Sequence, residues 1–248
     1  VGRAGVGLDN IDIAECRRRG VRIVHTPDAN GQAVAEFVFA LLLDALRPRR
    51  YLTQSLNATE WEVARKSLVA SRQLSDLTLG VLGLGRIGTR TSRLGIALGM
   101  RTLYHDLIDL PADRRAGATP VVYDELLAAS DVLSIHVDPR PSNRALINTG
   151  ALARCRPTVV IVNTSRGSVV DTPALAAFLR EHPQALALLD VHDPEPIAPN
   201  SPLLGLHNAR LTPHLAAATT TANANMSLVV RDVWRVLNGQ TPEHEAST

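Results

Sequence analysis

The hydrophobic pattern of the first part of the chain predicts few elements. A short helix is expected over Ile11–Arg19, because Gly20 is a natural C-terminal stop, and a brief apolar strand over Val21–Val24. A longer helix is predicted over Gln32–Leu46, and its apolar residues are so continuous that it should be buried on more than one side. Residues 49–73 are polar and predict a linker that is either helical or irregular.

From Leu74 onward, short apolar strands alternate with segments of helix length. Strands are predicted over 79–82, 101–104, 132–135, 159–162, 186–189 and 210–211, and helices over 87–98, 124–129, 149–154 and 173–180. Continuously apolar strands separated by helices indicate a parallel sheet that is covered on both faces. The predicted fold class is therefore α/β, with a doubly wound parallel sheet. A last helix is expected from about Thr220 to Leu237, followed after Gly239 by a frayed tail.

Composition and charge narrow the class of protein. The 248 residues are 45% hydrophobic, which suffices for the core of one large domain or two small ones. The net charge of +2 does not indicate a nucleic-acid partner, and no apolar run is long enough to span a bilayer. Cys16 and Cys155 are too few for a disulfide framework, so a reducing compartment, the cytoplasm, is expected. Because the chain begins at Val1 without a methionine, we also expect upstream sequence to be missing.

The sharpest local signal is a glycine-rich run, GLGRIG, at Gly83–Gly88 between a predicted strand and a predicted helix. In a dinucleotide-binding turn, Gly83 would allow the tight bend and Gly85 would let the backbone approach a pyrophosphate. Gly88 would let the helix pack closely on the strand. The amides and the positive dipole end at the start of the helix would then face the phosphates.

An acidic residue completes this pattern at the end of the next predicted strand. Asp106 would accept hydrogen bonds from the adenosine ribose hydroxyls and repel a 2′-phosphate, which favours NAD over NADP. The alternative is a glycine turn in an α/β domain that binds no nucleotide. The presence of strand, helix and acid together disfavours that alternative.

Three loops after predicted strands carry candidate catalytic groups. Oxidation of an alcohol by a nicotinamide needs a base, and an anionic substrate needs a cation such as arginine. Arg166, Glu195 and His214 lie on these loops and could converge on one crevice, since open α/β sheets bind ligands at the carboxyl ends of their strands. Taken singly, each also fits a plain role: Arg166 as a surface cation, Glu195 as a solvated acid, and His214 as a strand-end histidine bonded to the backbone. No metal site is suggested, because His192 and Asp193 have no matching ligand pair at metal spacing.

Several ordered motifs support a resemblance that covers almost the whole chain, from Val1 to about Gly239. Together they resemble the D-isomer-specific 2-hydroxyacid dehydrogenase family, which includes phosphoglycerate dehydrogenases and glyoxylate or hydroxypyruvate reductases. The motifs are Gly2–Asp12, Asn30–Leu43, Gly83–Gly88, Ser130–Val137, Asn163–Asp171, Glu195–Pro196 and Thr212–His214.

The resemblance implies an NAD-dependent oxidoreductase that transfers a hydride between nicotinamide and a small D-2-hydroxy acid or 2-oxo acid. Arg166 would bind the carboxylate and carbonyl of the substrate. His214 would be the general acid and base, and Glu195 would pair with it and favour its protonated form. The backbone amides of Val6 and Gly7 would also hold the substrate carboxylate.

The resemblance likewise implies a set of cofactor contacts, in which Asp190 would hydrogen-bond the nicotinamide carboxamide. The residues expected to contact NAD are Gly83, Gly85, Arg86, Ile87, Gly88, Asp106, His136, Val137, Thr164 and Asp190.

The resemblance also implies how the chain divides. Residues 1–31 would be the remnant of a flavodoxin-like α/β substrate domain, and residues 32–225 would form the Rossmann NAD-binding domain, including a crossing helix. Residues 226–248 would return to the substrate domain. The crossing helix Gln32–Leu46 would help to form a homodimer.

Some positions depart from the pattern of the family. His192 stands where the family often has Phe, and Asp138 and Arg140 replace residues that usually border the cofactor. Two alternatives to an active enzyme stay open, an NAD(H)-sensing protein of the same fold that resembles a corepressor, and a catalytically impaired fragment.

Overall fold

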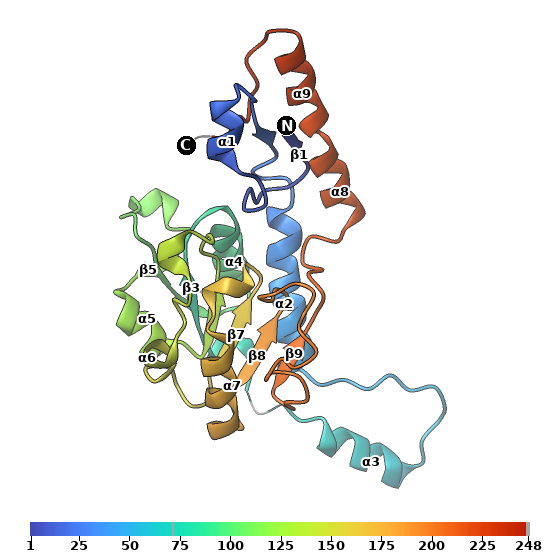
Figure 1. Cartoon of the computed structure of the whole chain (residues 1–248). Helices are drawn as coiled ribbons and strands as arrows, with labels where there is room; N and C mark the ends of the chain where they lie inside the picture. The colour runs from blue at the N-terminus through green and yellow to red at the C-terminus, as the bar shows by residue number, and fades with distance from the viewer. Residues whose placement is uncertain (71, 247–248) are drawn as a thin grey trace.

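The computed structural model describes residues 1–70 and 72–246 and places them in two lobes of unequal size (Figure 1). The larger lobe surrounds a seven-stranded sheet, and α2 runs from it toward the smaller lobe. The first residues of the chain and the last described ones, up to residue 246, lie in the smaller lobe, where α9 packs against a two-stranded parallel sheet. The elements in and next to this lobe are β1 (Gly2–Arg3), α1 (Ile13–Arg18), β2 (Val24–His25), α2 (Gly31–Leu46), α8 (Thr220–Ser227) and α9 (Val229–Leu237).

The large lobe is built on parallel strands in the order β5-β4-β3-β6-β7-β8-β9. The order reverses at β3, whose neighbours are β4 and β6, and ligands bind at such a switch point in folds of this kind. The strands are β3 (Thr78–Leu82), β4 (Arg101–His105), β5 (Thr119–Pro120), β6 (Val132–Ile135), β7 (Val160–Asn163), β8 (Leu186–Leu189) and β9 (Ala209–Leu211). The helices are α4 (Arg86–Ala97), α5 (Tyr123–Ala129), α6 (Thr149–Leu152) and α7 (Thr172–Glu181), with 3₁₀ turns at Leu74–Asp76, Ala112–Arg114, Pro141–Asn143 and Gly167–Val169.

Two hydrophobic cores lie on opposite faces of this sheet. Val160 and Val162 of β7 belong to the core that holds Val38 of α2. Ile161, between them, belongs to the core that holds Leu175 of α7. Strands β4, β5 and β9, toward the edges of the sheet, include polar or exposed residues. Because side chains alternate along a strand, the central strands β3, β6, β7 and β8 are buried on both faces and are mostly apolar. This confirms the predicted fold class, a doubly wound parallel α/β sheet.

Most predicted helices and strands match the structure within two residues, but the last predicted helix is wrong. It is two helices, α8 and α9, that meet at Leu228. The hydroxyl of Ser227 donates to the carbonyl oxygen of Asn223, and such bonding to the preceding turn bends helices. The strand expected over Val21–Val24 starts only at Val24, and β5 was not predicted.

The tail after Gly239 was expected to fray, and over residues 240–246 that prediction is wrong. The amide of Ala246 donates to the carbonyl oxygen of Ile23, and the amide of His25 donates to that of His244. Asp232, which is 4% exposed, accepts the amides of Glu243 and His244 at 2.9 and 3.0 Å. The buried carboxylate of Asp232 therefore holds the tail against α9. The composition of the chain could not reveal this contact. Residues 247–248 lie outside the described part of the chain.

Acid should release this tail. Desolvation alone would raise the pKa of Asp232, but hydrogen bonds from the Glu243 amide, from Arg235 and from the His244 amide lower it to about 2. Because this pKa lies below the ordinary 3.8, the contribution of Asp232 to stability is present above about pH 4 and is lost as pH falls toward 2. Asp232→Ala should remove about 2 kcal/mol from the free energy of unfolding at neutral pH, measured by urea titration. Glu243→Gln, at an exposed partner of Arg235, is the control, and an equal loss in both variants would contradict the prediction.

The segment expected to be a linker extends away from the large lobe as an arm that ends in α3 (Ala58–Ser67) (Figure 1). Asn57 and Glu60 form a reciprocal capping box at the start of α3. Several large apolar side chains of the arm are exposed, among them Tyr51, Trp61 and Val63. Among the described residues, none of the helices has both the length and the apolar character needed to cross a membrane.

Candidate active site

The glycine-rich loop joins β3 to α4. Gly83 has a φ of +90°, and a Cβ there would lie 3.0 Å from the carbonyl oxygen of His136. A Cβ on Gly88 would lie 2.1 Å from the carbonyl oxygen of Gly83, so α4 can pack this closely on the strand only without one. At Gly85, nothing lies within 4 Å of the equivalent position, and no side chain caps the helix. The start of α4 is therefore uncapped and has open space beside Gly85, which suits a phosphate site.

Asp106 follows β4 and lies beside this loop. Its carboxylate accepts the amide of Leu84 at 2.7 Å and that of Ile108 at 3.1 Å. Since a carboxylate has about four acceptor positions, these two hydrogen bonds fix Asp106 and leave capacity for a ribose hydroxyl.

His136 and Val137 follow β6 and border the same loop. The Nε2 of His136 lies 2.8 Å from the hydroxyl of Ser134, and desolvation lowers the pKa of His136 to about 3. Its imidazole is therefore neutral near pH 7 and does not serve as the cation of the site. Further along, Arg140 forms an ion pair with Asp138, so these two departures from the family pattern neutralise each other.

Thr164 and its neighbours lie at the carboxyl edge of β7. The Asn163 side chain accepts the amide and hydroxyl of Ser165 and donates to the carbonyl oxygen of Arg166 at 2.9 Å. The hydroxyl of Thr164 is buried and has no hydrogen-bond partner among the described residues. A buried polar atom without a partner at this edge fits a bound ligand that supplies one. No group of three His, Cys, Asp or Glu that could hold a metal ion occurs in the described part of the chain.

Arg166 is held by a carboxylate from the small lobe. Its Nε and Nη2 donate to Asp9 at 3.2 and 2.8 Å, and its Nη1 donates to the carbonyl oxygen of Ser165 at 2.8 Å. The hydrogen bond from Arg166 lowers the pKa of Asp9, and burial only partly opposes it. A Cβ on Gly7 would lie 1.9 Å from Nη2, so this position needs glycine for the guanidinium to fit. The amides of Val6 and Gly7 donate no hydrogen bond within the described residues.

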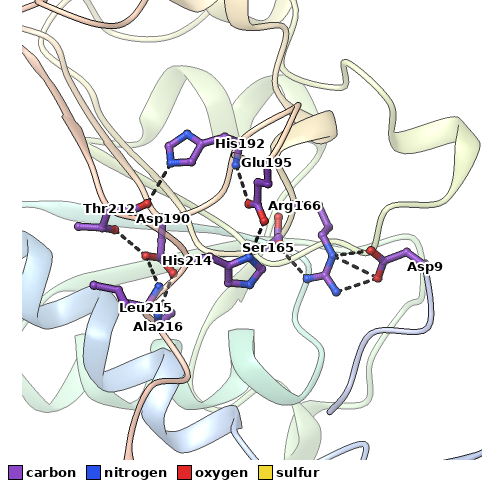
Figure 2. A network of polar contacts seen from close by, with 10 residues as sticks. All are labelled: Asp9, Ser165, Arg166, Asp190, His192, Glu195, Thr212, His214, Leu215 and Ala216. Atoms are coloured by element: carbon purple, nitrogen blue, oxygen red, sulfur yellow. Dashed lines mark hydrogen bonds and ion pairs between the residues drawn. The ribbon is translucent and has the colours of Figure 1, made fainter. Parts of the chain in front are cut away.

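His214 and Glu195 form the second side-chain pair of the site (Figure 2). The Nδ1 of His214 donates to Oε2 of Glu195 at 2.8 Å, and the amide of His192 donates to Oε1 at 2.9 Å. Burial alone would raise the pKa of Glu195, but these hydrogen bonds hold it below its ordinary value. Glu195 is therefore ionised near pH 7. The other ring nitrogen of His214, Nε2, has no hydrogen-bond partner among the described residues.

Asp190 organises the turn that carries His214. Its carboxylate is fully buried and accepts the hydroxyl of Thr212 at 2.5 Å and the amides of Leu215 and Ala216 at 2.8 and 2.7 Å. His214 itself has a φ of +55°, which few residues other than glycine adopt. The hydrogen bonds to Asp190 help to hold the turn in this conformation. The contact expected between Asp190 and the nicotinamide carboxamide stays a prediction.

Comparison with known proteins identifies the family. Residues 39–216 match the sequence model described as D-isomer specific 2-hydroxyacid dehydrogenase, NAD binding domain. The chain belongs to this family. The match covers the glycine-rich loop, Asp106 and the loops that carry Arg166, Glu195 and His214.

Individual relatives agree with this placement. The chain is 37% identical over 237 residues to a glyoxylate reductase from Aeropyrum pernix, which covers 94% of this chain and 71% of that protein. It is 37% identical to a D-3-phosphoglycerate dehydrogenase from Archaeoglobus fulgidus over 94% of this chain but only 44% of that longer protein. A D-lactate dehydrogenase from Aquifex aeolicus, solved with NAD and lactic acid, superposes with a TM-score of 0.80 at 30% identity, over 95% of this chain and 75% of that one.

Within this family member, the loops that carry Arg166, Glu195 and His214 follow β7, β8 and β9, which are neighbours in the sheet. Figure 2 shows the His214–Glu195 pair beside the Arg166–Asp9 pair. Sequence reasoning missed Asp9, although it lies in the quoted motif Gly2–Asp12. The available signal was the absence of a local counter-charge for Arg166.

Proposed function

We propose that this protein transfers a hydride between NAD(H) and a small 2-oxo or D-2-hydroxy acid. The observation that carries the proposal is the hydrogen bond of His214 Nδ1 to the ionised Glu195, which leaves Nε2 of the imidazole unbonded beside Arg166. A proton donor and a cation lie together at the carboxyl edge of an NAD-binding sheet, where they suit reduction of an anionic carbonyl compound.

The chemistry balances with one hydride and one proton. NADH, when bound, supplies the hydride to the carbonyl carbon of the substrate. His214, protonated on both nitrogens, gives the Nε2 proton to the carbonyl oxygen as that oxygen becomes a hydroxyl. Glu195 accepts from Nδ1 throughout, so the proton that moves is the one on Nε2. In the reverse direction, neutral His214 takes the hydroxyl proton.

Arg166 has donors left for the substrate carboxylate. Of its five N–H groups, one each on Nε and Nη2 serves Asp9, and one on Nη1 serves the carbonyl of Ser165. One N–H on Nη1 and one on Nη2 then stay on the outer edge, a fork that matches a carboxylate. The unbonded amides of Val6 and Gly7 add two more donors near this edge. Asp9 thus orients the arginine without occupying the edge we assign to the substrate.

An assay with the purified chain tests the proposal. NADH oxidation should be followed by absorbance with glyoxylate, hydroxypyruvate, pyruvate and branched 2-oxo acids. We expect turnover with at least one of them. NADH binding without turnover of any 2-oxo acid, in this chain and in a version extended upstream of Val1, would contradict the proposal and favour a sensor.

We propose that Asp106 selects NAD over NADP. Asp106→Asn keeps an oxygen for the Leu84 amide but removes the charge that would repel a 2′-phosphate. The ratio of the NADPH to the NADH dissociation constant, measured by nicotinamide fluorescence, should fall about tenfold or more. Asp109→Asn, on a 93% exposed side chain nearby, is the control. An unchanged ratio in Asp106→Asn would rule this role out.

We propose the division expected from the sequence, with residues 1–31 and 226–248 in the substrate domain and 32–225 in the NAD-binding domain. The packing of α9 on β1 and β2 supports it, and so does a family match that lies inside 32–225. The two free cysteines fit a reducing compartment, and on that ground we propose the cytoplasm.

We propose a homodimer as the assembly. The support is the arm that carries α3, which extends from the body and exposes Trp61 and Val63 at 49% and 63% (Figure 1). Apolar groups on a projecting arm favour burial against a second copy, to which α2 would contribute as the family resemblance implies.

Substitution on the arm tests the dimer. The double variant Trp61→Ser, Val63→Ser should shift the mass measured by light scattering from that of a dimer toward that of a monomer. Trp234→Ser, at a 68% exposed tryptophan on α9, is the matched control and should leave the mass unchanged. A monomeric mass for the unmodified chain would refute the assembly.

A further inference from the structure

His192 has no part in the proposed reaction, yet it contacts the site twice. Its backbone amide donates to Glu195, as described above, and its ring Nε2 lies 2.9 Å from the carbonyl oxygen of Thr212 (Figure 2). A carbonyl oxygen can only accept, so Nε2 carries a proton and donates it to the Thr212 carbonyl.

The carbonyl of Thr212 belongs to the turn that sets the direction of His214. It also accepts the backbone amide of His214 at 3.0 Å, and this amide donates as well to the carbonyl oxygen of Asp190 at 2.9 Å. Because His214 has a positive φ, the turn depends on hydrogen bonds from outside it. Asp190 supplies one set of them, and the ring of His192 supplies another from the loop that carries Glu195.

We propose that His192 is a positioning residue for His214. This inference rests on the proposed function. Four hydrogen bonds form a closed circuit. The His192 amide donates to Glu195, Glu195 accepts from the His214 imidazole, and the Thr212 carbonyl accepts both the His214 amide and the His192 imidazole. The loop after β8 and the turn after β9 are thereby held as one unit, which keeps Nδ1 of His214 on the carboxylate. Any residue except proline at position 192 keeps the amide contact to Glu195. The contribution of the His192 imidazole can therefore be tested alone.

Three variants separate the ring hydrogen bond from other effects. His192→Phe keeps a planar ring but cannot donate, and a cavity of about 240 Å³ that His192 borders gives it room. With the most active 2-oxo acid, kcat should fall about fivefold, the effect of one neutral hydrogen bond, while KM and the NADH dissociation constant stay unchanged. His192→Gln retains an N–H donor and should recover most of kcat. His207→Phe, at an exposed histidine outside the site, should match the unmodified protein.

A second readout does not need activity. The ¹⁵N shifts of the imidazoles at alkaline pH report the tautomers. In the unmodified chain we expect Nε2–H for His192 and Nδ1–H for His214, and in His192→Phe a mixture of tautomers for His214. An unchanged His214 spectrum together with unchanged kcat in His192→Phe would overturn the inference, as would a His192→Gln variant no better than His192→Phe. If no 2-oxo acid is turned over, the proposed function fails and the spectra alone decide the role of His192.

Discussion

Replacing His214 with Asn should lower kcat for every 2-oxo acid by about 10³-fold. The Asn amide can still donate to Glu195, and Asn tolerates the positive φ of this position better than most residues. The variant should therefore fold and hold its turn, but it cannot give a proton to the carbonyl oxygen. The measurement is steady-state NADH oxidation, with the NADH dissociation constant determined in parallel.

Two results would count against this role for His214. One is turnover within a few-fold of the unmodified protein, which would place the proton donor elsewhere. The other is a loss of NADH binding equal to the loss of turnover, which would make the effect structural. His207→Asn is the matched control, because His207 is exposed outside the site.

Arg166→Gln should lower kcat/KM for the 2-oxo acid by about 10³-fold, since it removes two charge-assisted hydrogen bonds to the substrate carboxylate. Arg166→Lys should recover only part of the loss, because an ammonium keeps the charge but not the fork that serves Asp9 and the substrate together. The affinity for NADH should change little in both variants, because the proposed contacts of Arg166 are with the substrate.

The same substitution should also change acid stability. In the unmodified chain the hydrogen bond from Arg166 lowers the pKa of Asp9. This pair therefore stabilises the protein fully above the ordinary carboxyl pKa, and that contribution is lost as pH falls through the lowered pKa of Asp9. Arg166→Gln should lose that dependence, measured as unfolding free energy against pH. Arg154→Gln, on an exposed pair with Asp124, serves as the control for both experiments. Equal kcat/KM in Arg166→Gln and the control would exclude the substrate contact.

The sheet could be predicted from the sequence because the hydrophobic pattern that specifies each strand is local. Strands β3, β6, β7 and β8 are buried on both faces, so each is a short, continuously apolar run bounded by polar turns. The glycine-rich loop was equally accessible, because the turn, the close helix contact and the open helix end all depend on residues within one hexapeptide. Parallel topology then placed Arg166, Glu195 and His214 at one edge of the sheet.

The sequence by itself thus determined the class of fold, the nucleotide loop and the edge where the candidate catalytic residues gather. Only the tertiary structure decided which groups they contact. Asp9 meets Arg166 across 157 positions of the chain, and the ring of His192 reaches Thr212 across 20. The buried carboxylates of Asp190 and Asp232 likewise organise the turn after β9 and the C-terminal tail, two segments without a regular hydrophobic pattern. The spacing of buried positions along a strand or helix is set by a few neighbouring residues. The partner of a polar side chain depends instead on which distant segments the packed core brings next to it.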